Sequence, residues 1–420
     1  MKWNIFIIIL SVFICITLFF SIFNYFEKSN KDIACKDCNV ILISIDTLRA
    51  DHLGIYDYEK NTSPHLDQFA KENILFKNFY SQATYTISSH ASIFTSLYPF
   101  NHHVYDQNAR VFNSTLTLPQ ILKLYNYTTV AFIGSGSKAA LPPYIFAYMF
   151  DSYNVKGVTT VDNTFPETKK WLELNSNGKF FLFWHIYDVH CPYRTPKLID
   201  PFCDSLLTSY SNVVIKDSID RYDNSISYVD SVIADFLNYL KEQGLYEKTI
   251  IIITSDHGEA FGEHKEYQHA GLPYFEQVNV PLILHIPGFN PTVVFNQGQS
   301  IDIVPTILNA LNISIPARID GASLLPSIRN SSIAVHNFTY SEYAGSYAFK
   351  SKDWEIFSDG NKVQLFNLNE DRYEKQDVME NNKKIGDFMK TEFDKWLSQH
   401  MIENIGNKSI VLNSTMIGYP

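Results

Sequence analysis

Runs of branched and aromatic apolar residues recur along the chain, and each run ends abruptly at polar residues. The clearest runs are residues 40–45, 130–133, 180–185 and 249–254. Unbroken runs of this length predict strands that are buried on both faces of a sheet. Helical stretches lie between them, and the longest, residues 217–243, repeats apolar positions at three- and four-residue steps before Gly244. Alternating strands and helices predict an α/β fold with a mostly parallel sheet.

The pattern changes after the turn-rich residues 316–326. Short segments of mixed polarity follow, such as residues 354–358 and 363–367, and these are typical of an antiparallel sheet. A last helix is expected near residues 385–397. We therefore expect a small carboxyl-terminal subdomain made of an antiparallel sheet and one helix.

The amino-terminal end predicts a membrane anchor. Residues 5–23 contain no charge and would span roughly 28 Å as a helix, which is one membrane thickness. The run exceeds a usual signal-peptide core and no small-residue cleavage site follows it, so we favour an uncleaved anchor over a cleaved signal peptide. Flanking lysines leave the orientation open. Cys191 and Cys203, which could form a disulfide in one polar loop, and several N-x-[ST] triplets favour a single-pass protein with an exoplasmic domain.

Length and charge narrow the function classes. The 420 residues suit one large α/β domain with a smaller one attached. The net charge is -10 and no stretch rich in lysine or arginine stands out, which argues against a nucleic-acid partner. An anionic substrate would therefore need local positive charge, from a metal or from histidine.

Chemically active side chains follow two of the predicted strands. Asp46 comes directly after residues 40–45, and Asp256 and His257 come just after residues 249–254. Open α/β sheets bind ligands at the carboxyl ends of their strands. Carboxylates beside an imidazole suit a divalent cation, and further acids and histidines follow closely at Glu259, Glu263, His264 and His269. The alternative is a solvated acidic turn with incidental histidines.

A second candidate segment covers residues 85–99. Small hydroxyl residues there lead into an apolar helix and place Thr86 near the helix amino end, where free N–H groups and the helix dipole favour an anion. An alkoxide nucleophile would be stabilised at the same place. The alternative is an ordinary helix cap.

Taken together, these segments resemble the sulfatase family of the alkaline phosphatase superfamily. Its signature has a nucleophile, two residues, Ser, then Arg or His and a small-residue helix ending near Tyr-Pro, to which residues 86–99 are similar. NVILISIDTLRADHLGIY, FFLFWHIYDVHCPY and the block ending in SDHGEAFGEH continue the resemblance, which runs from about residue 39 to about residue 400. It implies an alkaline-phosphatase-like fold: a mixed, mostly parallel sheet sandwiched by helices, with a small antiparallel carboxyl-terminal subdomain.

The expected organisation has five parts. They are a membrane anchor (1–26), a polar stem (27–38), a sulfatase-like catalytic domain (39–330), a carboxyl-terminal subdomain (331–400) and a tail (401–420).

The resemblance also implies a role for each matching residue. Asp46, Asp256 and His257 would bind the metal, and Thr86 would be both ligand and nucleophile. His190 would contact the oxyanion of the substrate or protonate the leaving group.

Three more positions receive roles in the same way. His269 falls where the family has Lys or His facing the same group, and His90 falls where it has Arg or His supporting the nucleophile. Arg49 would bind the substrate anion or tie down the metal loop. For His264 a site role and a structural role are equally compatible with the sequence.

The chain departs from the best-known sulfatases at its nucleophile. Those enzymes carry Cys or Ser there, which is oxidised to formylglycine, and Thr86 cannot be converted in that way. Attack would have to come from the Thr86 alkoxide, as in superfamily members that act on phosphate or phosphonate esters. Thr47 also stands where a second metal Asp is frequent, and His257 stands where Asn is frequent. Fewer carboxylates and one imidazole shift the metal preference from calcium toward manganese, zinc or magnesium.

The sequence thus predicts a membrane-anchored, metal-dependent hydrolase that cleaves sulfate or phosphate esters with Thr86. It would hold one divalent metal ion (Mn, Zn, Mg or Ca) and act on an anionic ester carried by a glycan or a lipid. One alternative is a transferase that moves a phosphoryl-bearing headgroup between lipid or glycan acceptors. The other is a catalytically silent binding ectodomain.

Overall fold

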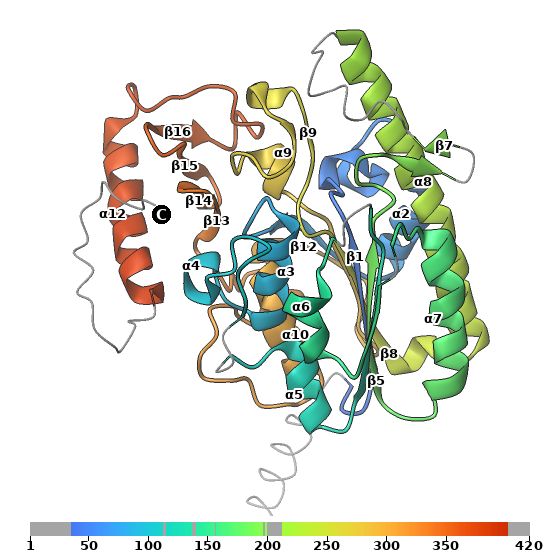
Figure 1. The fold of residues 1–420 in the computed structure, drawn as a ribbon. Coiled ribbons are helices and arrows are strands. Elements are labelled where there is room, and N and C mark those ends of the chain that lie inside the picture. The colour runs from blue at the N-terminus through green and yellow to red at the C-terminus, as the bar shows by residue number, and fades with distance from the viewer. Residues whose placement is uncertain are drawn as a thin grey trace, which may run out of the picture.

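The protein is described by a computed structural model that covers residues 35–111, 115–136, 140–155, 157–195, 198–199 and 212–401. Its largest sheet has eight strands in the order β12-β2-β11-β8-β1-β5-β3-β4 (Figure 1). The strands are β1 (Asn39–Ile45), β2 (Ile74–Tyr80), β3 (Thr128–Ile133), β4 (Ser152–Val155), β5 (Phe180–Ile186), β8 (Thr249–Thr254), β11 (Leu282–His285) and β12 (Thr292–Gln299). Strand β11 is antiparallel to both neighbours, and every other pair in this sheet is parallel. The expected mixed, mostly parallel sheet is confirmed.

Helices cover both faces of this sheet, which explains why its central strands are apolar throughout. Every residue of β1 and β8 is buried. On one face pack α2 (Pro64–Glu72), α7 (Val161–Asn175) and α8 (Asn212–Glu242), and on the other pack α3 (Thr86–Thr95), α5 (Leu118–Leu124) and α10 (Ile303–Ala310) (Figure 1). The long helix expected at residues 217–243 is therefore confirmed as a core element that begins earlier, at Asn212.

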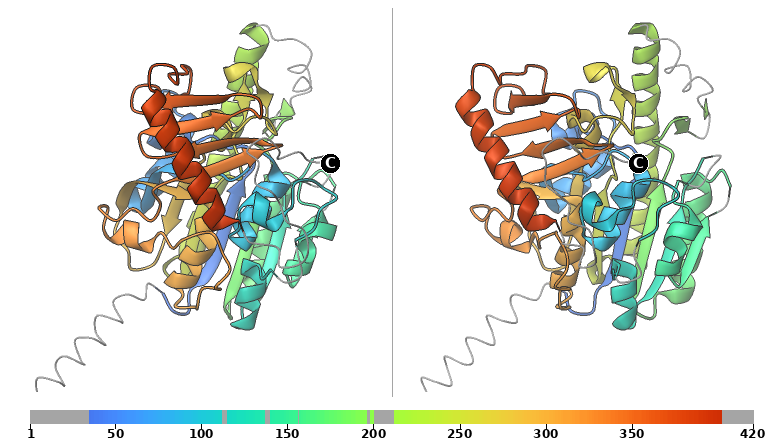
Figure 2. Two further views of the ribbon diagram at one scale, coloured as in Figure 1. Left: turned by 90° about the vertical axis from the view of Figure 1, so that its left-hand side faces the viewer. Right: turned by 60° about the vertical axis from the view of Figure 1, so that its left-hand side comes forward.

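The carboxyl-terminal subdomain also follows the sequence pattern. Its antiparallel sheet consists of β13 (Thr339–Tyr343), β14 (Ser346–Lys350), β15 (Trp354–Ser358) and β16 (Val363–Asn367). Helix α12 (Lys383–His400) lies across one face of this sheet (Figure 2). Aromatic side chains from both, among them Tyr340, Phe349, Phe393 and Trp396, form the core between them.

Shorter elements connect these layers. The helices are η1 (Ala50–His52), η2 (Gly54–Tyr56), α4 (Pro99–His102), α6 (Pro143–Phe146), η3 (Ala147–Met149), η5 (Tyr246–Lys248), η6 (Glu263–Lys265), α9 (Phe275–Val278), η7 (Ser300–Asp302) and α11 (Leu325–Arg329). The strands form two small antiparallel pairs: β6 (Arg194–Thr195) with β7 (Leu198–Ile199), and β9 (Ala260–Phe261) with β10 (Tyr267–Gln268).

Several predictions concern residues outside this description. The expected anchor, most of the stem, nearly all of the tail and Cys203 lie there. Within the described ranges, no helix is long and apolar enough to cross a membrane. Cys35 and Cys38 form a disulfide directly before β1, and Cys191 is also disulfide-bonded.

A buried charge cluster joins the subdomain to the main domain. Lys350 on β14 is 1% exposed and forms ion pairs with Glu355 and Glu374. The other carboxylate oxygen of Glu374 accepts a hydrogen bond of 2.9 Å from the backbone N–H of Phe275, in the main domain. Burial raises the pKa of Glu355 well above its usual value, and the charge of Glu374 adds to this effect. The single cation therefore holds together two buried acids.

Replacing this lysine is expected to destabilise the fold. Lys350→Met leaves Glu355 and Glu374 buried without their cation, so it should lower the free energy of unfolding by about 3–5 kcal/mol. Chemical denaturation measures this loss. The matched variant Lys352→Met, on an exposed lysine two positions away, should change it by no more than about 0.5 kcal/mol. Equal stabilities of the two variants would contradict the structural role of the cluster.

Candidate active site

Two carboxylates and one imidazole meet at the carboxyl ends of β1 and β8. The strands are parallel neighbours, with Ser44 opposite Thr254, so Asp46 emerges beside Asp256 and His257. His257 Nε2 lies 3.4 Å from Asp256 Oδ2 and 4.0 Å from Asp46 Oδ1, and all three side chains are fully buried. These are the three metal ligands predicted from the sequence, and the fold brings them together.

The oxygens of this cluster lack the partners that buried acceptors require. Both carboxylate oxygens of Asp46, and Oδ2 of Asp256, have no hydrogen-bond partner in the described part of the chain. Burial raises the pKa of Asp46 well above its usual value, and the charge of Asp256 raises it further. Burial lowers the pKa of His257 to about 4, so this imidazole is neutral. Unpartnered buried oxygens beside a neutral imidazole form a donor set that fits a divalent cation.

Thr86 is the first residue of α3 and reaches the same cluster. Its Oγ1 lies 3.1 Å from His257 Nε2. The preceding Tyr85 is extended, so α3 begins at Thr86, and N–H groups of a first helical turn have no partner within the helix. The hydroxyl, the imidazole and the carboxylates therefore belong to one site.

His90, one helical turn after Thr86, contacts the start of α3 and strand β1. Burial lowers the pKa of His90 to about 4. The neutral ring donates from Nδ1 to the Thr86 carbonyl at 2.8 Å, which leaves Nε2 to accept from the Ser44 hydroxyl at 3.0 Å. One nitrogen of His90 thus bonds to the first turn of α3 and the other joins α3 to β1, which fits the supporting role expected for this residue.

His190 and His269 form a second pair of imidazoles at the site. Their Nε2 atoms lie 3.2 Å apart, and His269 Nδ1 lies 3.3 Å from Glu259 Oε1. Burial lowers the pKa of His190 well below its usual value. Burial acts the same way on His269, but Glu259 and the two site aspartates outweigh it, so the pKa of His269 is raised. These charges favour the protonated form of His269. The stacked His257 and His269 rings connect this pair to the candidate metal ligands.

The two remaining candidates are held by other contacts. The Arg49 guanidinium pairs with Asp51 at 2.9 Å and with Glu263 at 2.8 Å, and it donates to the Glu259 carbonyl. Of its two predicted roles, this geometry fits the one that ties down the metal loop. His264 contacts Glu276 and the Glu374 carbonyl, both at 3.0 Å, which is a structural position.

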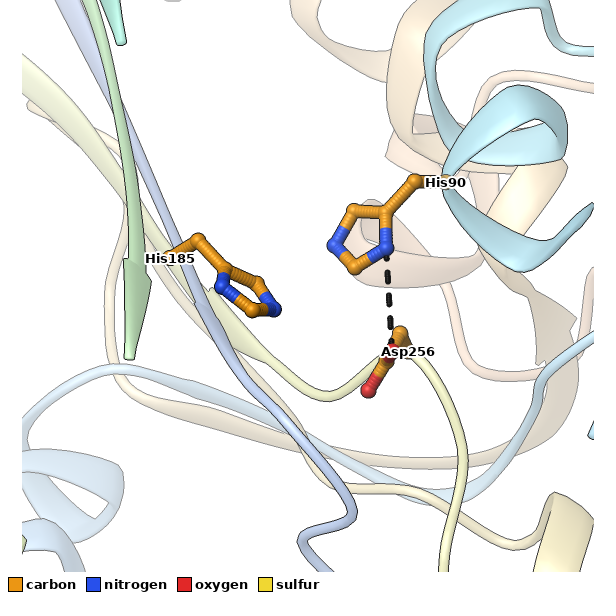
Figure 3. Close-up of side chains that lie close together, drawn as sticks. All are labelled: His90, His185 and Asp256. Carbon is orange, nitrogen blue, oxygen red and sulfur yellow. Dashed lines mark ion pairs between the residues drawn. The ribbon is translucent and has the colours of Figure 1, made fainter. Parts of the chain in front are cut away.

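The sequence reasoning did not assign a role to His185. It lies near the end of β5, where Figure 3 shows it facing the same space as His90 and Asp256. His185 Nε2 lies 3.2 Å from Asp46 Oδ2. One feature of the sequence could have indicated His185, because it is a histidine near the end of an otherwise apolar strand. Such a strand places its last side chains at the edge of the sheet that also carries Asp46.

A cavity of about 790 Å³ opens beside the first turn of α3. Its walls include Ser88, the loop at residues 103–109, and Glu342 and Tyr343 of β13. Neither Ser88 Oγ nor Glu342 Oε1 has a well-formed hydrogen bond within the described ranges. The backbone N–H of Glu342 donates a hydrogen bond of 3.0 Å to the carbonyl oxygen of Gln82. This bond holds the subdomain next to the segment that leads into Thr86.

The sequence model of the sulfatase family matches residues 38–313, which is most of the main domain. The chain belongs to the sulfatase family. A second model, for the carboxyl-terminal part of N-sulphoglucosamine sulphohydrolase, matches residues 262–409. The chain is thus a sulfatase-family hydrolase, and members of this family are metal-dependent.

Known relatives span several chemistries. An arylsulfatase of Clostridium perfringens is 24% identical over 79% of this chain and 88% of its own length. Lipoteichoic acid synthase 2 of Bacillus subtilis is 28% identical over 66% of this chain, but over only 45% of its own length. The phosphonate monoester hydrolase of Agrobacterium radiobacter has a similar structure, with a TM-score of 0.71 and 16% identity over 86% of this chain and 96% of that one. The alkaline-phosphatase-like α/β fold is therefore confirmed.

Proposed function

We propose that this sulfatase-family hydrolase cleaves phosphate or sulfate esters with Thr86 as its nucleophile. The observation that carries the proposal is the Thr86 hydroxyl, which lies 3.1 Å from His257 Nε2 beside carboxylates with unpartnered oxygens. Asp46, Asp256, His257 and Thr86 would hold one divalent cation. When bound, this cation supplies the positive charge that lowers the pKa of the Thr86 hydroxyl and neutralises the ester.

The residues of the chain account for the rest of the reaction. Thr86 gives its hydroxyl proton to solvent, and its oxygen forms a bond to phosphorus or sulfur as the bond to the leaving alcohol breaks. The first-turn N–H groups of α3 stabilise the negative charge of the transferred group. The leaving alcohol takes the proton held by His269 and His190. Water then attacks the Thr86 ester and regenerates the hydroxyl.

The identity of the nucleophile favours phosphorus as the centre attacked. A formylglycine hydrate can eliminate its ester group, whereas an ester on Thr86 must be hydrolysed by attack at phosphorus or sulfur. The phosphonate monoester hydrolase, whose structure is similar, is named for an ester of phosphorus. We therefore infer a preference for phosphodiesters or phosphonate esters over sulfate esters.

A transferase is the second candidate, and the cavity beside Ser88 favours it. Ser88 in the wall of the cavity is two residues from Thr86, and an alcohol bound in the cavity could replace water in the second step. The proposed anchor at residues 5–23 would keep the site near lipid-linked acceptors. The candidate metal ligands, the candidate nucleophile and the histidine pair are all present, which argues against a silent binding ectodomain.

The full-length chain, purified in detergent and stripped of metal, can separate these functions. We expect Mn²⁺ or Zn²⁺ to restore turnover of an aryl phosphodiester and an aryl phosphonate ester, with slower turnover of an aryl sulfate. Added glycerol would give a phosphoglycerol product if the enzyme transfers. Failure of every metal and ester to support turnover would favour the binding ectodomain, and a preference for the aryl sulfate would reverse the inferred preference.

Glu342 is proposed to contact the organic part of the substrate. Burial raises the pKa of Glu342 to about 7, and the hydroxyl groups of Tyr340 and Tyr105 both interact with this carboxyl, which lies in the wall of the cavity. Glu342→Gln should raise KM about tenfold for a substrate with hydroxyl or ammonium groups, equivalent to about 1.4 kcal/mol. The kcat for a small aryl ester, and both constants of the exposed-site variant Glu370→Gln, should stay unchanged. An unchanged KM would exclude this contact.

A further inference from the structure

We propose that His185 is an additional ligand of the same cation, provided by strand β5. The inference rests on the proposed metal site and goes beyond it, because it adds a second imidazole to the ligand set. The pairing of the strands explains the placement, since β5 is the other parallel neighbour of β1 and His185 lies opposite Ser44. Three strands would thus converge on the ion: β1 with Asp46, β8 with Asp256 and His257, and β5 with His185.

The first argument is an unexplained contact between two buried acceptors. His185 Nε2 and Asp46 Oδ2 lie 3.2 Å apart, and both side chains are fully buried. Despite this distance they form no hydrogen bond, and neither atom has another partner among the described residues. Buried polar atoms are almost always satisfied, so this pair requires a group that binds both.

The second argument is the orientation of the His185 ring. Its Nδ1 lies 3.0 Å from the carbonyl oxygen of Gly134, which can only accept, so Nδ1 carries the proton. The lone pair of Nε2 therefore faces the lone pairs of the Asp46 carboxylate. A backbone carbonyl that fixes the tautomer in this way is the usual support of a metal-binding histidine.

The third argument is that the separations match a single coordination sphere. Neighbouring ligands bound at about 2.1 Å from one ion lie roughly 3.0–3.4 Å apart, depending on the geometry. The His185 to Asp46 separation of 3.2 Å falls in this range, as do 3.1 Å between Thr86 and His257 and 3.4 Å between His257 and Asp256. The longer separation of 4.0 Å, between His257 Nε2 and Asp46 Oδ1, is close to that of two ligands on opposite sides of such an ion.

Two neighbours show why His185 in particular is suited to this role. The Thr47 hydroxyl contacts the backbone carbonyl oxygens of Asp46 and Val189, at 2.7 and 3.2 Å, rather than the carboxylates of the site. His90 Nδ1 lies 3.6 Å from Asp256 Oδ2, the contact marked by a dashed line in Figure 3, but both nitrogens of His90 already have hydrogen-bond partners. His185 alone among these three offers an unused nitrogen lone pair to the site. Two imidazoles beside two carboxylates favour Zn²⁺ or Mn²⁺ over Mg²⁺ or Ca²⁺.

Metal titration of the full-length apoprotein tests this ligand without using activity. His185→Gln should weaken Zn²⁺ binding at least about tenfold in calorimetry and should change Mg²⁺ binding much less. The control His285→Gln alters another buried strand histidine of the same sheet, which contacts Asn73 at 2.7 Å, and should bind Zn²⁺ like the wild type. Zn²⁺ affinity within twofold of the wild type in His185→Gln would overturn the proposal.

A second variant gives a direct spectroscopic readout. His185→Cys places a thiolate at the same position, so Cd²⁺ should produce a new ultraviolet thiolate-to-metal charge-transfer band that is absent from the wild type with Cd²⁺. Absence of this band in a variant that still binds Cd²⁺ would show that position 185 does not reach the ion, while leaving the proposed metal site intact. A wild-type chain that binds no divalent cation would instead overturn the metal site and the His185 ligand together.

Discussion

Thr86→Ala is expected to lower kcat on an aryl phosphodiester by about 10³ to 10⁶-fold, because the variant has no atom that can form the covalent ester. Zn²⁺ or Mn²⁺ affinity should fall far less, since Asp46, Asp256 and His257 remain. Steady-state kinetics and calorimetry on the same preparation measure the two effects. Their separation distinguishes a nucleophile from a residue that only binds the ion.

Thr86→Ser supplies the matched control. It keeps a hydroxyl at the start of α3 and should retain activity within about tenfold of the wild type. Intact-mass measurement after rapid quenching should detect an adduct on the wild type and on Thr86→Ser, and none on Thr86→Ala. Turnover that survives in Thr86→Ala but is lost in Asp256→Asn would exclude Thr86 as the nucleophile and point to direct attack by water.

The sequence predicts the central part of this fold well because burial on both faces leaves a simple pattern. Strands β1, β3, β5 and β8 each appear as an unbroken apolar run, and polar residues mark where each run stops. The antiparallel direction of β11 leaves no such mark, because a short buried strand has the same composition in either direction. The direction is set by the path of the chain through β2 and β12, which only the structure shows.

Some positions of the site could likewise be predicted from the sequence, and others could not. Asp46, Asp256 and His257 could be predicted because each lies just after a strand, where ligands of α/β sheets bind. The position of His185 beside Asp46 depends on the register of β5 against β1, which no local pattern encodes. The role of Arg49 depends on Asp51 and Glu263, and Glu263 is far away in sequence. Glu342 reaches the cavity only because β13 packs beside the segment before Thr86.

Asp256→Asn is expected to separate metal binding from folding. The wild-type site holds two buried carboxylates close together, and the charge of Asp256 already raises the pKa of Asp46. In the metal-free state Asn keeps an oxygen that can accept from the backbone N–H groups of Thr47 and His257. It loses the carboxylate charge that the neighbouring histidines favour, which lowers the pKa of Asp256 to about 2, so its free energy of unfolding should fall modestly. With metal the difference should widen, because the variant loses a charged ligand and its affinity should fall about 100-fold or more.

The size of this metal-dependent difference follows from mass action. At a cation concentration 100 times the wild-type Kd, binding stabilises the wild type by about 2.7 kcal/mol, and a 100-fold weaker variant gains only about 0.4 kcal/mol. Denaturation with and without Zn²⁺ measures both quantities, and kcat should fall at least about 10³-fold because the Thr86 hydroxyl is no longer activated. A variant that is destabilised equally with and without metal would show that Asp256 acts in packing. If the variant loses its activity and only the part of its stability that depends on metal, Asp256 binds the ion, because packing does not depend on added cation.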